Sequence, residues 1–258
     1  MSAPAVVITG AAAGIGRAIA RRLLAGGWAV VAVDLDGDAL GALERASGRA
    51  PLAVLAGDVA DPATLERAAA TAQERFGRLD AWVNNAAIPT EGPFEHESLE
   101  RLDRTLAVNL RAPLLGCQVA VRAFLAAGTA GVIVNVSSIH ARAGFPGWIA
   151  YDATKGGIEA LTRSVCVEFG PRGIRCNAVA PGAVLTAATS RVLEAAPDQE
   201  ELRRQWRELS PMGAVLAPDD VAASVAYLLS ADARFVNGHV LAVDAGMAAR
   251  CVALPPPR

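Results

Sequence analysis

The stretch VVITGAAAGIGRAIA, residues 6–20, joins an apolar run, a glycine-rich turn and the start of an amphipathic helix. The apolar run is typical of a strand that is buried on both faces. Gly10, Gly14 and Gly16 form a G-x-x-x-G-x-G pattern, which lets the backbone turn sharply and approach a pyrophosphate closely. The helix that follows offers free N–H groups and the positive end of its dipole. A tight strand-to-helix turn without a ligand has the same spacing, so the context has to decide.

Apolar strand candidates alternate with helical stretches rich in Ala, Leu, Arg and Glu along the rest of the chain. This order predicts an α/β fold, a doubly wound parallel seven-stranded sheet with helices on both faces (Rossmann fold), in a single domain over residues 1–258. One region, about residues 185–217, contains no strand and has the position of a substrate lid at the carboxyl end of the sheet. The strand candidates are 5–9, 28–34, 51–58, 79–85, 131–138, 174–181 and 239–246.

Composition excludes several classes of protein. With 53% hydrophobic residues the chain can bury a large core, and a formal charge of −2 without any basic run argues against nucleic-acid binding. The apolar stretches are too short to predict a membrane span, and the N-terminus lacks the pattern of a signal peptide. Four scattered cysteines without CxxC spacing indicate neither a metal site nor a disulfide framework. We therefore expect a cytoplasmic protein without a metal.

The second strand candidate ends at Asp34, about twenty residues beyond the glycine loop. An acidic side chain there accepts hydrogen bonds from the ribose hydroxyls of a dinucleotide and repels a 2′-phosphate. Leu35 follows, and no cation is placed to hold that phosphate. The sequence therefore favours NAD over NADP as the cofactor.

The segment YDATKGG, residues 151–157, places a phenol and an ammonium four residues apart. On a helix, Tyr151 and Lys155 would lie on the same face and could reach a common point. Taken alone, such a pair is usually an ordinary feature of a helix surface.

The chain resembles the short-chain dehydrogenase/reductase family over roughly residues 5–246. The resemblance rests on TGAAAGIG (9–16), DV (58–59), NNAA (84–87), VNL with Asn109, NVSS (135–138), YDATK (151–155) and NAVAPGAVLT (177–186). Two departures from the usual family pattern, Ala87 and Ala245, remove no functional side chain.

The resemblance implies roles for residues that their own chemistry would not identify. Asp58 and Val59 would hold the adenine, while Asn85 and Ala86 would line the cofactor cleft. The expected cofactor contacts also include Tyr151, Lys155, Ile15 of the glycine loop, Leu35, and four residues near the nicotinamide: Pro181, Gly182, Val184 and Thr186.

Four side chains carry the expected chemistry, the interconversion of a secondary alcohol and a ketone. A free tyrosine has a pKa of about 10, and a neighbouring ammonium and a positive nicotinamide would both favour its phenolate form. Tyr151 would act as the base in oxidation and the acid in reduction. Ser138 would orient the substrate oxygen, Lys155 would lower the pKa of the phenol and bind the ribose, and Asn109 would interrupt its helix and hold a water against Lys155.

The substrate side of the sequence is less specific. His140, Arg142 and Trp148 lie between Ser138 and Tyr151, and Glu91 follows the fourth strand candidate. A polar edge beside an apolar wall favours a small polyol, sugar or hydroxy acid, although each of these side chains can equally face solvent or the core. In the lid, the charged residues suit a solvated helix face, and Trp206 and Met212 are the better candidates for substrate contact.

Helices expected around residues 99–127 and 152–169 carry apolar residues on more than one face, which indicates a second packing partner. Because similar family members pair these helices across two-fold axes, the resemblance implies a homotetramer, with a dimer or a purely intramolecular core as alternatives. Two other functions stay open. One is a 3-oxoacyl-thioester reductase, which usually works with NADPH and which Asp34 disfavours. The other is a non-catalytic NAD-binding regulator, which would not need the set Asn109, Ser138, Tyr151 and Lys155.

Overall fold

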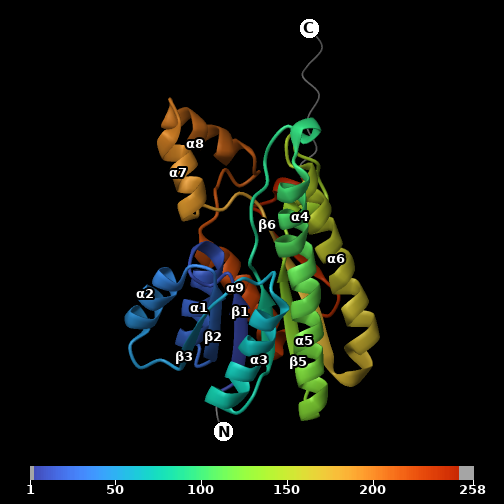
Figure 1. Ribbon diagram of the computed structural model, residues 1–258. Coiled ribbons are helices and arrows are strands. Elements are labelled where there is room, and N and C mark those ends of the chain that lie inside the picture. Colours follow the sequence, from blue (N-terminus) through green and yellow to red (C-terminus); the bar gives the residue numbers. More distant parts are fainter. Residues whose placement is uncertain (1–2, 250–258) are drawn as a thin grey trace.

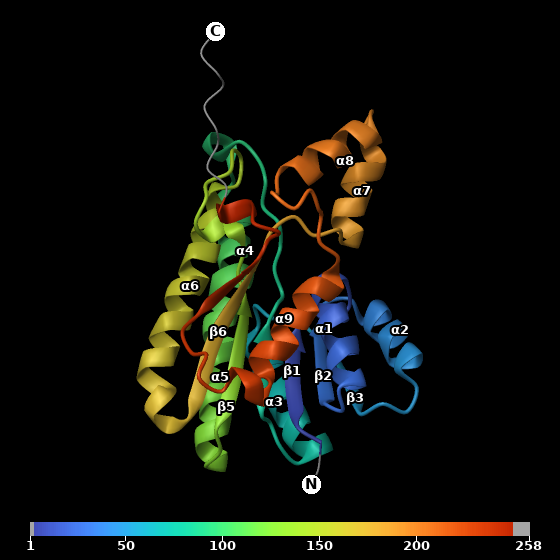
Figure 2. The same cartoon turned by 180° about the vertical axis from the view of Figure 1, so that it is seen from behind.

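The computed structural model describes residues 3–249 and contains one seven-stranded sheet with parallel pairing throughout. The strand order is β3-β2-β1-β4-β5-β6-β7, so the chain reverses its direction of winding between β1 and β4 (Figures 1 and 2). This confirms the predicted sheet, and the predicted strands differ from the observed ones mainly at their ends. The bounds are β1 Ala5–Thr9, β2 Ala29–Asp34, β3 Leu52–Ala56, β4 Ala81–Asn84, β5 Gly131–Val136, β6 Ile174–Pro181 and β7 Val240–Val243.

Helices cover both faces of the sheet because successive strand residues point to opposite sides. In β1, Val6 and Ile8 face one core cluster, to which helices α1, α2 and α9 contribute. Val7 faces the other cluster, together with residues of α3, α5 and α6. The helix bounds are α1 Gly14–Ala25, α2 Gly37–Ser47, α3 Pro62–Phe76, α4 Leu99–Leu106, α5 Ala112–Ala127, α6 Ile149–Phe169 and α9 Pro218–Leu229.

Two further helices, α7 (Ala187–Ala195) and α8 (Gln199–Glu208), form the segment between β6 and α9. They stand beyond the sheet, at the end of the molecule opposite to the N-terminus (Figures 1 and 2). Helix α7 begins with a capping box of Thr186 and Thr189, and α8 begins at Asp198, whose carboxylate accepts the Glu201 N–H. The segment predicted as a lid therefore consists of two capped helices next to the carboxyl end of β6.

The long helical run Leu99–Ala127 is broken in the middle by a π turn over Ala107–Arg111. By length and hydropathy alone this run could cross a membrane, and 44% of its most apolar window is buried inside the protein. Helix α5 packs on β4, β5, α3 and α6, which accounts for its apolar character.

Half of the apolar residues behind the tetramer prediction are buried within the chain itself, and Leu115, Leu161 and Phe169 are partly buried. Val119, Phe124, Ile158 and Val165 are all at most 7% exposed, whereas Leu114 on α5 is 45% exposed. The homotetramer stays a prediction. Cys251 and the PPPR tail lie outside the described residues, and Cys117, Cys166 and Cys176 are free thiols.

Candidate active site

The glycine loop between β1 and α1 has the conformation that its sequence predicts. Gly10 and Gly14 adopt φ values of +65° and +51°, which L side chains rarely take. A Cβ on Gly16 would lie 2.0 Å from the Gly10 carbonyl oxygen, so this glycine permits close packing of helix on loop. The residue before α1, Ala13, gives no side-chain cap, which leaves the first N–H groups of the helix open to an anionic ligand. The loop thus fits a pyrophosphate.

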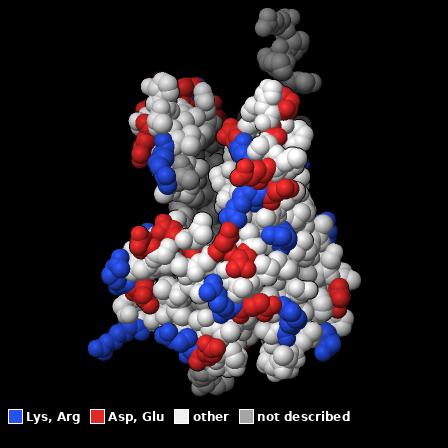
Figure 3. All heavy atoms as spheres, viewed as in Figure 1, with Lys and Arg blue, Asp and Glu red and all other residues white. Residues whose placement is uncertain are grey.

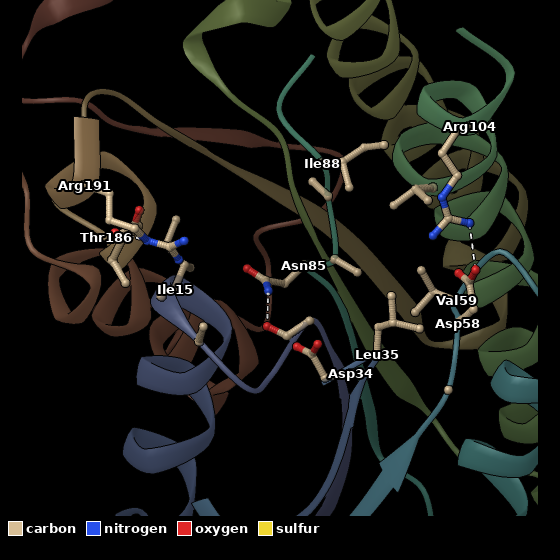
Figure 4. A pocket seen from close by; sticks show the side chains of 18 residues that line it. Ile15, Asp34, Leu35, Asp58, Val59, Asn85, Ile88, Arg104, Thr186 and Arg191 are labelled. Atoms are coloured by element: carbon tan, nitrogen blue, oxygen red, sulfur yellow. Dashed lines mark hydrogen bonds and ion pairs between the residues drawn. The ribbon is translucent and has the colours of Figure 1, made fainter. Parts of the chain in front are cut away.

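Asp34 holds the glycine loop as well as ending β2. One of its carboxylate oxygens accepts the Ala12 N–H at 2.9 Å and the other accepts the Asp36 N–H at 3.1 Å. The side chain lines the cleft beside Leu35, which is 68% exposed (Figure 4). This position is the one expected for an acceptor of ribose hydroxyl groups.

Asn85 connects the glycine loop to the end of β4. Its side-chain amide donates to the carbonyl oxygens of Thr9 at 3.0 Å and of Gly10 at 2.9 Å. The hydroxyl of Thr9 accepts the backbone N–H groups of Asn85 and Ala86. These bonds fix the floor of the cleft at the point where the strand order reverses.

Arg104 on α4 is a cleft residue that the sequence analysis missed. It pairs with Asp58 at 2.7 Å on the side of the cleft opposite to Arg191 (Figure 4). Partial burial works against ionisation of Asp58, but the hydrogen bonds from Arg104 and from the Ala60 N–H hold its pKa below the usual value. Arg104 lies 46 residues from Asp58 in the chain, and no local pattern marks it.

Most of the predicted cofactor residues line a cleft with two adjoining parts, which share Ile15, Asn85 and Thr186 in their linings. Gly16 lines neither part and serves packing instead. The first part is lined by Gly10, Gly14, Ile15, Asp34, Leu35, Asp58, Val59, Asn85, Ala86 and Thr186. The second part is lined by Ile15, Asn85, Tyr151, Lys155, Pro181, Gly182, Val184 and Thr186.

The structure brings Ser138, Tyr151 and Lys155 to the second part of the cleft. Ser138 follows β5, and its side chain hydrogen-bonds that of Tyr151 on α6. The Lys155 ammonium lies 5.3 Å from the centre of the Tyr151 ring and donates to the Val136 carbonyl at 2.9 Å. The three side chains therefore meet as the spacing of the sequence predicts.

The pKa values in this group differ from the sequence-based expectation. Burial raises the pKa of Tyr151 to about 12, and the charge of Asp152 adds to this effect while the hydrogen bond with Ser138 opposes it. Burial also lowers the pKa of Lys155 to about 8. At neutral pH the phenol of Tyr151 is therefore neutral, and Lys155, with a pKa of about 8, is still mostly protonated but close to losing its proton. Lys155 by itself does not make the phenol acidic.

Asn109 lies in the π turn, and its side chain is occupied. Its amide oxygen accepts the Ile88 N–H at 2.8 Å, and its amide nitrogen donates to the Ile88 carbonyl at 2.8 Å. The expected interruption of the helix is present, but the side chain holds the loop after β4.

The predicted substrate residues divide into two groups. His140 and Trp148 line the second part of the cleft, next to Tyr151. Arg142 does not line it, because its guanidinium pairs with Glu159 on α6 at 3.1 Å. Glu91 is also absent from the lining, as the loop turns its backbone toward Arg101 and its side chain toward Gly147. Arg142 and Glu91 therefore do not line this part of the cleft, and their contact with a substrate stays a prediction without support from this geometry.

The lid segment contributes side chains from both of its helices. Trp206 and Leu209 of the α8 region line the second part of the cleft, whereas Met212, predicted to touch substrate, is 76% exposed and lies outside it. Arg191 on α7 lines the first part, and the sequence analysis did not select it although it follows Thr186 closely. Phe145 and Met247 also line the second part and were not indicated by the sequence.

Known proteins resemble the chain over nearly its whole length. A family model described as enoyl-(acyl carrier protein) reductase matches residues 10–248. The chain is 39% identical to 3beta-hydroxysteroid dehydrogenase 1 of Eggerthella lenta, over 94% of this chain and 92% of that protein. It is also 39% identical to 2-(R)-hydroxypropyl-CoM dehydrogenase of Xanthobacter autotrophicus, over 92% of this chain and 96% of that protein. The crystal structure of levodione reductase superposes with a TM-score of 0.90 at 33% identity, covering 96% of this chain and 98% of that one.

Proposed function

The chain belongs to the short-chain dehydrogenase/reductase family, and we propose that it is an NAD-dependent enzyme that interconverts a secondary alcohol and a ketone on a small molecule. The similar proteins are named as dehydrogenases or reductases, and a nicotinamide cofactor is common to their family. Their named substrates differ from one another, so no substrate is carried over to this chain. The observation that carries the proposal is the meeting of Ser138, Tyr151 and Lys155 in a cleft that adjoins the glycine loop.

The residues of the cleft fit a dinucleotide along its length. The glycine loop and the open start of α1 suit the pyrophosphate, and Asp34 suits the adenosine ribose. The preference for NAD rests on the Asp34 carboxylate, which would repel a 2′-phosphate, and on the exposed apolar Leu35 beside it. When bound, the nicotinamide supplies the hydride acceptor for oxidation or the hydride donor for reduction.

The protein's own part in the reaction is the handling of the substrate oxygen. In oxidation, the Tyr151 oxygen takes the hydroxyl proton of the substrate, and in reduction it returns that proton to the carbonyl oxygen. Ser138 donates a hydrogen bond to the same oxygen and orients it. A pKa of about 12 suits Tyr151 as an acid, and its use as a base requires further positive charge nearby. Lys155 and the oxidised nicotinamide are the two sources of such charge.

The polar substrate expected from the sequence has lost part of its basis, because Arg142 and Glu91 lie outside the cleft. His140 lines the second part of the cleft and suits the hydroxyl groups of a polyol or sugar. Among the described residues, no arginine lines this part, so a hydroxy acid would have no guanidinium there to bind its carboxylate. The cytoplasmic location and the homotetramer stay predictions. Figure 3 shows acidic and basic side chains interspersed on one face, in keeping with the small net charge.

The test is an absorbance assay for reduced cofactor, with NAD or NADP and a panel of secondary alcohols, polyols and hydroxy acids. We expect turnover with NAD that Tyr151→Phe abolishes. A strong preference for NADP would favour the thioester reductase, and cofactor binding without turnover of any alcohol or ketone would favour the regulator.

A further inference from the structure

His140 is held in one orientation at the wall of the substrate part of the cleft. Its ring stacks on Phe145, with centroids 4.0 Å apart and planes at 27°, and meets Tyr151 edge-on at 5.2 Å. Its backbone N–H donates to the Ser138 hydroxyl at 3.2 Å. The imidazole is therefore positioned against the same two residues that would hold the reacting oxygen.

Asp152 determines which nitrogen of His140 carries the proton. The Asp152 carboxylate lies 2.6 Å from Nδ1 and its other oxygen accepts the Phe145 N–H at 3.1 Å. An ionised carboxylate only accepts hydrogen bonds, so Nδ1 must donate. In the neutral imidazole the other nitrogen, Nε2, is then a hydrogen-bond acceptor.

Nε2 is open to the cleft. Nε2 of His140 makes no hydrogen bond within residues 3–249, where every fully buried side-chain nitrogen or oxygen has a partner. Nε2 is therefore not fully buried. The side chain of His140 is 17% exposed and lines the cleft, so its free nitrogen is within reach of the space that a substrate would fill. Because Nε2 is a hydrogen-bond acceptor near Tyr151 and Ser138, it is suited to bind a hydroxyl group on the substrate carbon next to the reacting carbon.

The rest of this part of the cleft has little to offer an anion. Among the described residues that line it, Lys155 is the one charged side chain, and it donates to the Val136 carbonyl. Even a protonated His140 would form a neutral pair with Asp152. The remaining walls are mostly apolar and include Ile139, Phe145, Trp148, Trp206, Leu209 and Met247.

We propose that His140 is a substrate-binding residue whose Nε2 accepts a hydrogen bond from a hydroxyl next to the reacting carbon, and that the substrate is an uncharged vicinal diol or hydroxyketone with an apolar body. Asp152 is the positioning residue that fixes the tautomer of His140. This inference rests on the proposed function, which it deepens by naming the class of substrate.

The test compares three probes that share one ring: cyclohexane-1,2-diol, its monomethyl ether 2-methoxycyclohexanol, and 2-hydroxycyclohexanecarboxylate. The ether keeps the second oxygen but has no hydrogen to donate to Nε2. For the wild type we expect kcat/KM to be at least about tenfold higher for the diol than for the ether, and the carboxylate to be the poorest of the three. His140→Phe keeps an aromatic ring on Phe145, and we expect it to bring the diol-to-ether ratio close to one through a higher KM for the diol.

Asp152→Asn gives a second, independent reading. An amide at this position can donate to Nδ1, so that Nε2 carries the hydrogen and can donate to the ether oxygen. The diol-to-ether ratio of kcat/KM should then fall because kcat/KM for the ether rises. A variant that only made the loop more flexible would not raise kcat/KM for the ether. Glu91→Gln and Arg142→Gln lie outside the cleft and serve as controls that should keep the wild-type ratio.

A wild-type ratio near one, an unchanged ratio in His140→Phe, or a preference for the carboxylate would each overturn the inference. Binding of the same three probes, followed by the fluorescence of Trp148 and Trp206, keeps it testable if turnover is slow. Failure of the proposed function has a different signature: no alcohol or ketone is turned over with either cofactor, whatever the probes' affinities.

Discussion

The ammonium of Lys155 lies 5.3 Å from the centre of the Tyr151 ring, and its hydrogen bond goes to the backbone of Val136. Both groups are deeply buried, and burial disfavours the charged form of each. It raises the pKa of the Tyr151 phenol to about 12 and lowers the pKa of the Lys155 amine to about 8. Tyr151 and Lys155 thus have the arrangement expected from the sequence. In the proposed reaction, an oxidised nicotinamide would supply the further positive charge that favours the phenolate.

The first prediction concerns Tyr151→Phe, which removes the acid/base group and keeps the ring. Because a positioned acid/base group typically contributes about 10²–10⁴-fold, we expect kcat to fall by at least that factor. Binding of NADH, followed by its fluorescence, should change little, since the glycine loop and Asp34 are untouched. Turnover close to that of the wild type would show that Tyr151 is not the proton carrier.

The second prediction concerns the stability cost of burying Lys155. Its pKa is 10.5 when unperturbed and about 8 in the folded protein, so the unfolded chain binds more protons between these values and stability rises with pH there. Below pH 8 the full cost of burying the Lys155 charge is present, and the pKa shift corresponds to at most about 3 kcal/mol in the free energy of unfolding. Replacing Lys155 recovers less than this, because the hydrogen bond to the Val136 carbonyl is lost. Lys155→Met should therefore unfold at higher urea than the wild type at pH 7, although it loses activity.

The pH dependence separates this cause from simple improvement of packing. The advantage of Lys155→Met should shrink as pH rises from 8 toward 10, because the wild-type lysine becomes neutral in the folded state. Urea unfolding of both proteins at pH 7 and pH 9.5 measures the difference. An advantage that is the same at both values would mean that charge burial is not its source.

The third prediction concerns close packing at the glycine loop. A Cβ at Gly16 would meet the Gly10 carbonyl at 2.0 Å and the Asn85 amide at 2.5 Å, so Gly16→Ala forces the loop to move. We expect a loss of about 1–3 kcal/mol in the free energy of unfolding, together with weaker NADH binding. Gly41→Ala in α2 is the matched control, since its Cβ meets only the flexible Arg45 guanidinium and removal of a helix glycine should stabilise by about 0.5–1 kcal/mol. Equal effects of the two substitutions would contradict this interpretation of the loop.

The sequence was sufficient for the fold and for residues whose role depends on local backbone pattern. Glycines at fixed spacing, apolar strands and a tyrosine-lysine pair on one helix are local signals, and the structure places them as expected. The sequence could not show that Arg142 and Glu91 lie outside the cleft lining, because the direction of a loop side chain depends on its partner in space, which for Arg142 is Glu159. Arg104 was missed for the same reason, as its contact with Asp58 is made by packing of α4 against the loop after β3.

The fourth prediction concerns the choice of cofactor. Asp34→Ala removes the carboxylate that would repel a 2′-phosphate, and Leu35→Arg adds a cation beside it that could bind this phosphate. In the double variant we expect the ratio of kcat/KM for NAD to kcat/KM for NADP to fall at least about 100-fold. Leu35→Arg alone is the control, because it leaves the bond between Asp34 and the Ala12 N–H intact. A wild type that already prefers NADP would show that Asp34 serves the loop and does not select the cofactor.

The last prediction concerns Arg191, which lies on α7 and lines the cleft near Ile15 of the glycine loop (Figure 4). Its guanidinium donates to the Ala187 carbonyl and forms no ion pair within the described part of the chain, so its charge is available to a bound phosphate. Because a hydrogen bond to a charged group contributes about 1.5–3 kcal/mol, Arg191→Ala should weaken ADP binding roughly 10-fold or more. Adenosine, which lacks phosphates, should bind equally to both proteins.

Arg203→Ala on α8, whose guanidinium pairs with Glu200 outside the cleft, is the control that should leave ADP affinity unchanged. Because an exposed charge pair is screened by salt, the difference between Arg191→Ala and the wild type should narrow between 50 and about 500 mM salt. An equal loss of adenosine and ADP affinity would instead mean that Arg191 supports the shape of the cleft, and that α7 does not contribute a charge to cofactor binding.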